Sequence, residues 1–369
     1  MSNIKNTENL KKNVKKSVIL SFVFIFVCAS LFSAGKSEIQ TEVVSVDKHG
    51  NVNLSVKGSS FPARGFGASD IVNVKIGSYK FTSPIVQNYS DVNNGEFLLR
   101  LNGDEVSLAI NMGNFSEKTN SKVGDKVTIT MKEKRGYLTT YQLRSLKRDD
   151  EREHYSSDET FANFRPVEIG KIAKGRLYRS TNPIESDFHA SYAASLMENA
   201  GVNLVLNLAD TKEVALDRMS SSSYYKNLAD NGNVIFLNMG SSFTSDDFIS
   251  KLHDALAFIA SNPGKTYYIH GKEGKNRTGY VSAVLAALNE ASLEEITNDY
   301  MLSFKNYYGV EEGSQQYNEL AKSVNYIFSN MNDGKMPSEK NLQRTVKKYL
   351  VTTVGLTEDE VLALEKNLR

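Results

Sequence analysis

The sequence predicts an α/β protein, with a sheet flanked by helices, preceded by a small all-β barrel or sandwich domain. Between residues 39 and 131, short runs of alternating apolar and polar residues are separated by turn residues, as in all-β domains. Beyond residue 166, strand-like and helix-like runs alternate, which is typical of a parallel-rich sheet covered by helices. The 369 residues are enough for two domains with a core each.

The first 35 residues have the form of a secretory signal peptide. Five lysines precede an apolar run over residues 18–32, and three small residues follow at 33–35. The run is too short for a clear membrane span. Two alternatives remain open: an uncleaved anchor, and a lipid anchor on Cys28, although Phe26 and Val27 stand where small residues are usual. We therefore expect a secreted, periplasmic or envelope-associated protein, with membrane attachment through the N-terminus as the alternative to cleavage.

Cleavage after residue 35 would leave a nearly neutral protein without a thiol. The formal charge changes from +1 to about −3, because five lysines and one glutamate are removed. A nearly neutral protein is not expected to bind nucleic acid in general. Cys28 is the only cysteine of the chain, so the mature protein would have no disulfide and no cysteine nucleophile. We predict neither a cofactor nor a metal site.

Residues 36–140 are assigned to the all-β accessory domain, whose strand-like runs are separated by turns rich in Asn, Gly and Asp. We find no catalytic group of residues in this half. A charged stretch at 141–165 is expected to be a linker or an exposed helix between the domains. Within this stretch, the serines at 156–157 could cap a short helix whose Phe161 and Phe164 pack inward.

The second domain is assigned to residues 166–369. Helices are expected at 187–200, 248–260, 293–304, 317–331, 342–354 and 358–368, and strands at 202–208, 234–239 and 266–269. Polar residues at the carboxyl ends of parallel strands face the ligand crevice of α/β sheets, so Asp210 is a candidate site residue. The alternative is a loop aspartate that caps the next segment.

The stretch H-G-K-E-G-K-N-R-T at residues 270–278 connects the last expected strand to an apolar helix. N–H groups at the start of a helix are unpaired, and the helix dipole favours negative charge there. Lys272, Lys275 and Arg277 add positive charge, and the planar guanidinium of Arg277 suits two oxygens of one phosphate. The sequence therefore predicts a phosphate-binding loop.

This loop resembles the signature of the cysteine-dependent protein tyrosine and dual-specificity phosphatases, H-C-x-x-G-x-x-R-[ST]. His270, Gly274, Arg277 and Thr278 match it at the same spacing. The branch that reads H-C-x-x-G-K-D-R-T, found in bacterial tyrosine and phosphoinositide phosphatases, is the most similar. The run G-R-L-Y-R-S at 175–180 resembles the start of such domains and would bring Arg179 towards the active-site rim. The resemblance implies a cysteine-phosphatase-like sheet for residues 166–369, with His270 among the residues of the phosphate site.

Two positions depart from the signature. Gly271 stands where the family has its nucleophilic cysteine, and glycine has no side chain that could attack phosphorus. Asn276 stands where the branch has an aspartate, and an amide cannot act as a carboxylic acid. In the family mechanism, a thiolate attacks phosphorus while the loop and its arginine hold the oxygens, and an aspartic acid protonates the leaving group. The residues that hold phosphate are kept, and the attacking residue is missing.

Other charged residues leave alternatives open. Asp246 and Asp247 lie near the place of a mobile acid loop in some family members, but they also suit the first turn of a helix. Glu273 could activate water, although a phosphate dianion would repel it. Lys272 and Lys275 could bind phosphate or remain in solvent, and His270 is expected to order the loop by hydrogen bonds rather than act as a base.

These observations favour a pseudophosphatase that binds a phosphorylated small molecule or a phosphoprotein without turnover. One alternative is an active phosphatase on phosphotyrosine, phosphoinositide or inositol phosphate. Another is an envelope structural or binding protein that acts through its β domain. The two loop lysines favour a polyanionic ligand.

Overall fold

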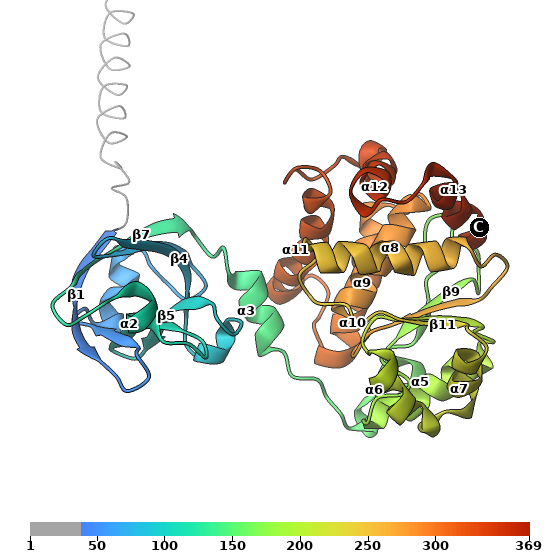
Figure 1. Cartoon of the computed structure of the whole chain (residues 1–369), viewed down its shortest axis with the longest axis horizontal. Helices are drawn as coiled ribbons and strands as arrows, with labels where there is room; N and C mark the ends of the chain where they lie inside the picture. The colour runs from blue at the N-terminus through green and yellow to red at the C-terminus, as the bar shows by residue number, and fades with distance from the viewer. Residues whose placement is uncertain (1–37) are drawn as a thin grey trace, which may run out of the picture. The chain divides into compact units, whose positions relative to one another are not determined.

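The computed structural model describes residues 38–369, which form two compact units divided after residue 141 (Figure 1). The segment predicted to be a signal peptide, including Cys28, lies outside the described residues. Within residues 38–369, no helix is both long enough and apolar enough to cross a lipid bilayer.

The first unit is a closed barrel of seven strands, which decides between the barrel and the sandwich that the sequence allowed. The strand order is β1-β2-β6-β5-β4-β3-β7, and the neighbouring strands are antiparallel except for the pair β4 and β5. Alternate residues fill the interior, for example Val72, Val74 and Ile76 on β3. The elements are β1 (Glu38–Val46), β2 (Val52–Leu54), β3 (Ile71–Ile76), β4 (Tyr79–Val86), β5 (Phe97–Asn102), β6 (Glu105–Ile110), α2 (Phe115–Thr119) and β7 (Lys126–Glu133).

The second unit is a five-stranded sheet, β11-β10-β12-β9-β8, covered by helices on both faces (Figure 1). Strands β11, β10, β12 and β9 are parallel, and β8 lies antiparallel to β9 at one edge. The predicted α/β fold is therefore present. The strands are β8 (Arg165–Pro166), β9 (Leu177–Ser180), β10 (Leu204–Asn207), β11 (Val234–Phe236) and β12 (Tyr267–His270). The helices are α4 (Asp158–Phe161), α5 (Phe188–Asn199), α6 (Lys212–Arg218), α7 (Ser223–Asp230), α8 (Asp246–Ala260), α9 (Asn276–Leu288), α10 (Leu293–Tyr308), α11 (Gln315–Asn330), α12 (Leu342–Tyr349) and α13 (Glu358–Leu368).

Two segments differ from the expectation. The linker expected at 141–165 belongs from residue 142 onwards to the second unit, and the division between the units falls within α3 (Leu138–Ser145). Ser157 caps α4 by accepting a hydrogen bond from the Thr160 N–H, and Phe161 and Phe164 are buried. The helix expected at 342–354 is α12 followed by a π-helical turn at Leu350–Val354.

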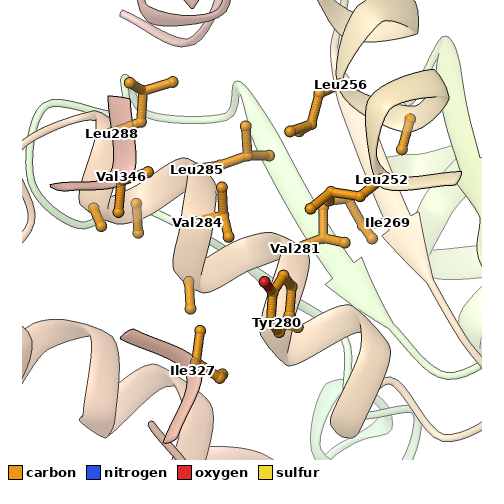
Figure 2. Close-up of a cluster of buried hydrophobic side chains, with 14 of the residues drawn as sticks. Leu252, Leu256, Ile269, Tyr280, Val281, Val284, Leu285, Leu288, Ile327 and Val346 are labelled. Atoms are coloured by element: carbon orange, nitrogen blue, oxygen red, sulfur yellow. The ribbon is translucent and has the colours of Figure 1, made fainter. Parts of the chain in front are cut away.

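The sheet and α9 form the main core of the second unit. Along β10, Leu204 and Leu206 face the core cluster of α8 and α9, whereas Val205 faces the cluster of α5 and α7. Helix α9 is buried from Thr278 to Leu288, and apolar side chains of other elements, such as Leu256, Ile327 and Val346, lie around it (Figure 2). A helix that is apolar all round is a core helix. Its first turn therefore provides a rigid support for the loop that precedes it.

Candidate functional site

The predicted phosphate-binding loop connects the carboxyl end of β12 to the first turn of α9. Strands β10, β12 and β9 are parallel, so the segments that follow them lie at the same edge of the sheet. Loop residues 271–278, together with Met239, Gly240 and Ser241, line a cavity of about 450 Å³. The structure thus gives a cavity at the place where the sequence predicts phosphate.

Three carbonyl groups of the loop accept hydrogen bonds from side chains that do not line the cavity. The bonds run from Thr181 Oγ1 to Lys272 O (2.8 Å), from Asn163 Nδ2 to Glu273 O (3.1 Å) and from Arg179 Nη2 to Gly274 O (2.8 Å). The C=O and N–H of a trans peptide point in opposite directions. These bonds therefore turn N–H groups of the loop towards the cavity, where an anion would accept from them.

Gly274 allows the loop to approach β9 closely. Its φ angle is +67°, and a Cβ at this position would lie 2.2 Å from Ser180 O. Both the left-handed backbone and the contact exclude a larger residue.

Arg179, which the resemblance places towards the active-site rim, lies behind the loop. Its buried guanidinium donates to Gly274 O and pairs with Asp299, which also pairs with Arg165 at 2.8 Å. Burial opposes ionisation of Asp299, but the two guanidinium groups hold the pKa of this carboxyl below its ordinary value. Arg179 is therefore a positioning residue for the loop.

Arg277 borders the cavity from the first turn of α9. Its Nη1 donates to Leu208 O (3.0 Å) and Met239 O (2.7 Å), which fixes the plane of the guanidinium. Its Nε lies 3.9 Å from the point where a Cβ at residue 271 would stand. Burial lowers the pKa of Arg277, yet a guanidinium remains charged in proteins. The side chain thus holds a charged N–H donor at the floor of the cavity.

His270 is completely buried beneath the loop, and its Nε2 lies 3.0 Å from the Tyr225 hydroxyl. Burial holds the pKa of His270 well below its ordinary value, so the ring is neutral at neutral pH. This arrangement suits the expected ordering role rather than that of a base.

Gly271 forms the floor of the cavity. A Cβ here would lie 3.1 Å from Thr278 Oγ1, a buried hydroxyl oxygen that has no hydrogen-bond partner among the described residues. The φ angle of Gly271 is not positive, so the backbone does not require glycine. A small side chain would therefore require Thr278 Oγ1 to shift by a few tenths of an ångström, and no backbone atom outside the neighbouring residues lies within 4 Å of the added Cβ. Asn276 Oδ1 in the cavity lining is likewise buried and without a partner in the described chain.

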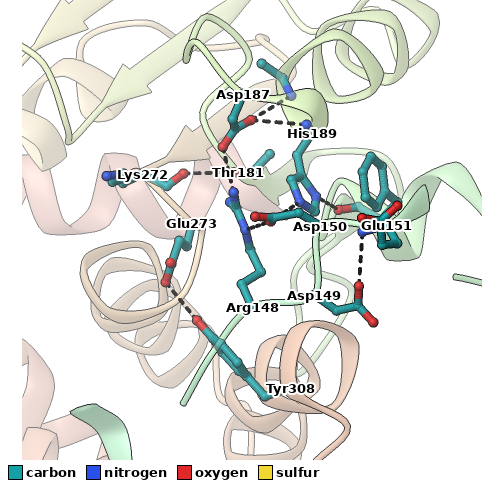
Figure 3. A network of polar contacts seen from close by, with 12 residues as sticks. Arg148, Asp149, Asp150, Glu151, Thr181, Asp187, His189, Lys272, Glu273 and Tyr308 are labelled. Atoms are coloured by element: carbon teal, nitrogen blue, oxygen red, sulfur yellow. Dashed lines mark hydrogen bonds and ion pairs between the residues drawn. The ribbon is translucent and has the colours of Figure 1, made fainter. Parts of the chain in front are cut away.

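The remaining charged loop residues differ in their surroundings. Lys275 Nζ lies 3.1 Å from Glu273 Oε2 and donates to the Tyr308 hydroxyl at 2.7 Å. The Tyr308 hydroxyl in turn donates to Glu273 Oε2 at 2.9 Å (Figure 3). Lys272 is exposed, and no carboxylate of residues 38–369 forms an ion pair with it.

The three candidate aspartates outside the loop do not line the cavity. Asp210 lies at the same edge of the sheet, but its buried carboxylate is paired with Arg218 at 3.0 Å and accepts from two asparagine amides. Asp246 and Asp247 lie in the first turn of α8, and Asp247 pairs with Lys251 at 2.8 Å. Within residues 38–369, no group of His, Asp or Glu side chains is arranged to hold a metal ion.

Sequence reasoning missed three residues that shape this site: Asn163, Asp299 and Tyr308. Each belongs to a segment far from the loop in the chain. Asn163 and Tyr308 contact the loop itself, and Asp299 pairs with Arg179, which donates to Gly274 O. The helical pattern of residues 293–304 was visible, but it did not show which of its polar residues would face the loop.

Two family models match the chain. Residues 159–369 match the model of the tyrosine phosphatase family, and residues 41–128 match that of the SAM hydroxide adenosyltransferase C-terminal domain. A search of the curated proteins found no match.

Several solved structures are similar to parts of the chain. An uncharacterised conserved protein from Thermotoga maritima is 27% identical over 26% of this chain and 36% of its own, with a TM-score of 0.25. A conserved hypothetical protein from Thermus thermophilus is 20% identical over 24% of this chain and 34% of its own, with a TM-score of 0.20. The chain thus spans about a third of the length of these two structures. The core catalytic domain of the PP-IP phosphatase SIW14 from S. cerevisiae is 21% identical over 47% of this chain and 93% of its own, with a TM-score of 0.27.

Proposed function

The chain belongs to the tyrosine phosphatase family, and from this premise we propose that residues 142–369 bind a phosphorylated ligand without hydrolysing it. The observation that carries the proposal is the floor of the cavity, where Gly271 occupies the place of the family's nucleophile. Residues 38–369 contain no cysteine that could replace it. The ligand is a phosphorylated small molecule or a phosphoprotein.

The groups that would hold phosphate support this proposal. Helix α9 begins without a side-chain cap, so its first N–H groups are left for a ligand. Arg277 adds a charged donor whose orientation is fixed by two carbonyl oxygens. A tetrahedral anion would therefore find N–H donors on the loop and a guanidinium beside it.

The groups that would cleave a phosphate ester are missing from the same cavity. The leaving group needs a proton from an acid, and the amide of Asn276 in the lining is too weakly acidic to supply one. Glu273 is already held by Lys275 and Tyr308. Because neither a thiol nor a free carboxylic acid lines the cavity, binding without turnover is the expected result.

The test combines binding with activity. Calorimetry on the wild type should show binding of inorganic phosphate and of a phosphotyrosine peptide, and a chromogenic phosphate ester should not be hydrolysed. Arg277→Ala should weaken binding by at least about tenfold, since a hydrogen bond to a charged group contributes about 1.5–3 kcal/mol. Sustained hydrolysis by the wild type that is lost in Arg277→Ala would overturn the proposal in favour of an active phosphatase. Absence of binding to both ligands would also overturn it.

The same proposal includes export from the cytoplasm, supported by the basic and apolar pattern of residues 1–35. Sequencing the N-terminus of the mature protein tests it. A mature start near residue 36 supports cleavage, and a lipid-modified start at Cys28 would support an anchor instead. An intact chain that stays in the cytoplasm would contradict both.

A further inference from the structure

The loop carries three cations in sequence, but the structure does not leave all three for a ligand. Lys275 forms an ion pair with Glu273, whose carboxylate lies 3.1 Å from the ammonium group. The Tyr308 hydroxyl bridges the pair, because it accepts from Lys275 and donates to Glu273. The Lys275 ammonium also lies 4.4 Å from the centre of the Tyr308 ring. Lys275 thus makes three contacts with two residues of the protein, Glu273 and Tyr308.

Burial makes this pairing strong. The side chain of Lys275 is 10% exposed and that of Glu273 is 32% exposed. Burial opposes the charge of Glu273, but Lys275 and the Tyr308 hydroxyl hold the pKa of the carboxyl below its ordinary value, so Glu273 stays ionised at neutral pH. Two opposite charges in a partly buried site attract each other more strongly than in water. The pair therefore contributes almost no net charge to the cavity.

Two further arginines of the second unit are also paired. Arg148 lies 2.7 Å from Asp150 and 2.9 Å from Asp187 (Figure 3), and Arg218 lies 3.0 Å from both Glu185 and Asp210. Among the described residues that line the cavity, the cations without a carboxylate partner are Lys272 and Arg277. Their two charges match one phosphate monoester dianion. A pyrophosphate or an inositol polyphosphate would bring more negative charge than these two cations balance.

We propose that Glu273, fixed by Tyr308, is a specificity-determining residue that limits the cavity to ligands presenting a single phosphate dianion. This inference rests on the proposed function, namely that the cavity binds phosphate. It reverses the expectation of a polyanionic ligand, which counted Lys272 and Lys275 as free charges. The carboxylate of Glu273 acts by neutralising Lys275, so a second phosphate group placed beside the first would find no free cation there.

The test compares inorganic phosphate with inorganic pyrophosphate by calorimetry at low ionic strength, where screening is weakest. The variant Glu273→Gln keeps the shape of the side chain and removes its charge. It should strengthen pyrophosphate binding by about tenfold and phosphate binding by about threefold, because the energy of a charge pair scales with ligand charge. The wild type should bind pyrophosphate no more tightly than phosphate.

Two more variants separate the role of Glu273 from a general change of charge. Asp230→Asn removes a carboxylate that pairs with Lys226 at the end of α7. This end of α7 lies near the amino end of β11, whereas the loop follows the carboxyl end of β12, so both affinities should stay unchanged. Tyr308→Phe removes the bridging hydroxyl but no charge, and should strengthen pyrophosphate binding by about threefold.

Each outcome decides between the proposals. An equal gain for the two anions in Glu273→Gln, or no gain, would overturn the role of Glu273 while leaving phosphate binding intact. Binding by Glu273→Gln but not by the wild type would overturn the proposed function and support the effect of the carboxylate. If no variant binds either anion, both proposals are wrong.

Discussion

The phosphate-binding loop has a back face, where its carbonyl groups meet Asn163 and the end of β9, and a front face, which lines the cavity. The two faces differ in how completely their polar groups are hydrogen-bonded. On the back, Asn163 reaches the loop carbonyls from one segment, and Arg179 and Thr181 reach them from the carboxyl end of β9. On the front, Thr278 Oγ1 is buried and unpartnered in the described chain, and α9 begins without a side-chain cap. The polar groups of the back are therefore satisfied by the fold itself, whereas the front keeps unpartnered groups, as the proposed binding of phosphate requires.

This difference explains how a cavity can persist without a nucleophile. Buried polar groups that lose a partner destabilise a protein, so the back face is constrained by folding whether or not a ligand binds. On the front, residue 271 is glycine and contributes no side-chain contact to the fold. Changes on the back should therefore cost stability, and changes on the front should alter binding or reactivity.

The largest effect is expected on the back, for Asp299→Asn. This change leaves the guanidinium groups of Arg165 and Arg179 buried beside a neutral amide, and we expect the free energy of unfolding to fall by about 4 kcal/mol. Urea denaturation of the second unit measures it. Asp247→Asn removes the same charge from an exposed pair with Lys251 and should change stability by less than about 1 kcal/mol. Equal effects in the two variants would contradict the role of the back face.

The next largest loss of stability is expected for Gly274→Ala, and a control at Gly264 separates the cost of the close contact from that of backbone strain. Gly274→Ala places a Cβ 2.2 Å from Ser180 O at a φ angle of +67°, and should lower the free energy of unfolding by about 3 kcal/mol. Gly264→Ala is the matched control, because its φ angle is +74° and no atom lies within 4 Å of the added Cβ. It should cost only about 1 kcal/mol, the strain of the left-handed backbone. If the two substitutions cost the same, the contact with β9 does not shape the loop.

The sequence predicted the front of the loop better than its back. The strand, the loop and α9 follow one another in the chain, so a local pattern placed His270 and Arg277 correctly relative to each other. The donors behind the loop come from the carboxyl end of β9 and from the segment expected to be a linker, and no local pattern tells which of their polar groups bond the loop carbonyls. The sequence likewise did not show the pairing of Lys275 with Glu273, because Tyr308 completes it from 33 residues further along the chain.

A front-face change with an intermediate effect on stability is Arg277→Ala. It removes the donor to Leu208 O and Met239 O, which should lower the free energy of unfolding by about 1.5 kcal/mol. Its main effect should be on the ligand: a given phosphate concentration should raise the melting temperature less than in the wild type, because the variant binds phosphate at least about tenfold more weakly. Arg277→Lys keeps the charge but not the planar donors, and should recover part of the binding. Full binding by Arg277→Ala would contradict the assignment of the front face.

The smallest effect on stability, and the most direct view of the front face, is expected for Gly271→Cys. Its Cβ would lie 3.1 Å from Thr278 Oγ1, a hydroxyl that can adjust, so the free energy of unfolding should change by less than about 1 kcal/mol. The new thiol would lie beside Arg277 and the first turn of α9, and we expect its pKa to fall below the ordinary value of about 8.5. In protein lacking residues 1–35 it is the single thiol, so the pH dependence of alkylation measures its pKa directly. Gly240→Cys, at another glycine of the lining with open space around it, is the matched control. The prediction fails if the pKa of the thiol at residue 271 is no lower than that of the thiol at residue 240. It also fails if phosphate does not protect the thiol at residue 271 from alkylation. Either result would show that the electrostatic potential beside residue 271 is not positive.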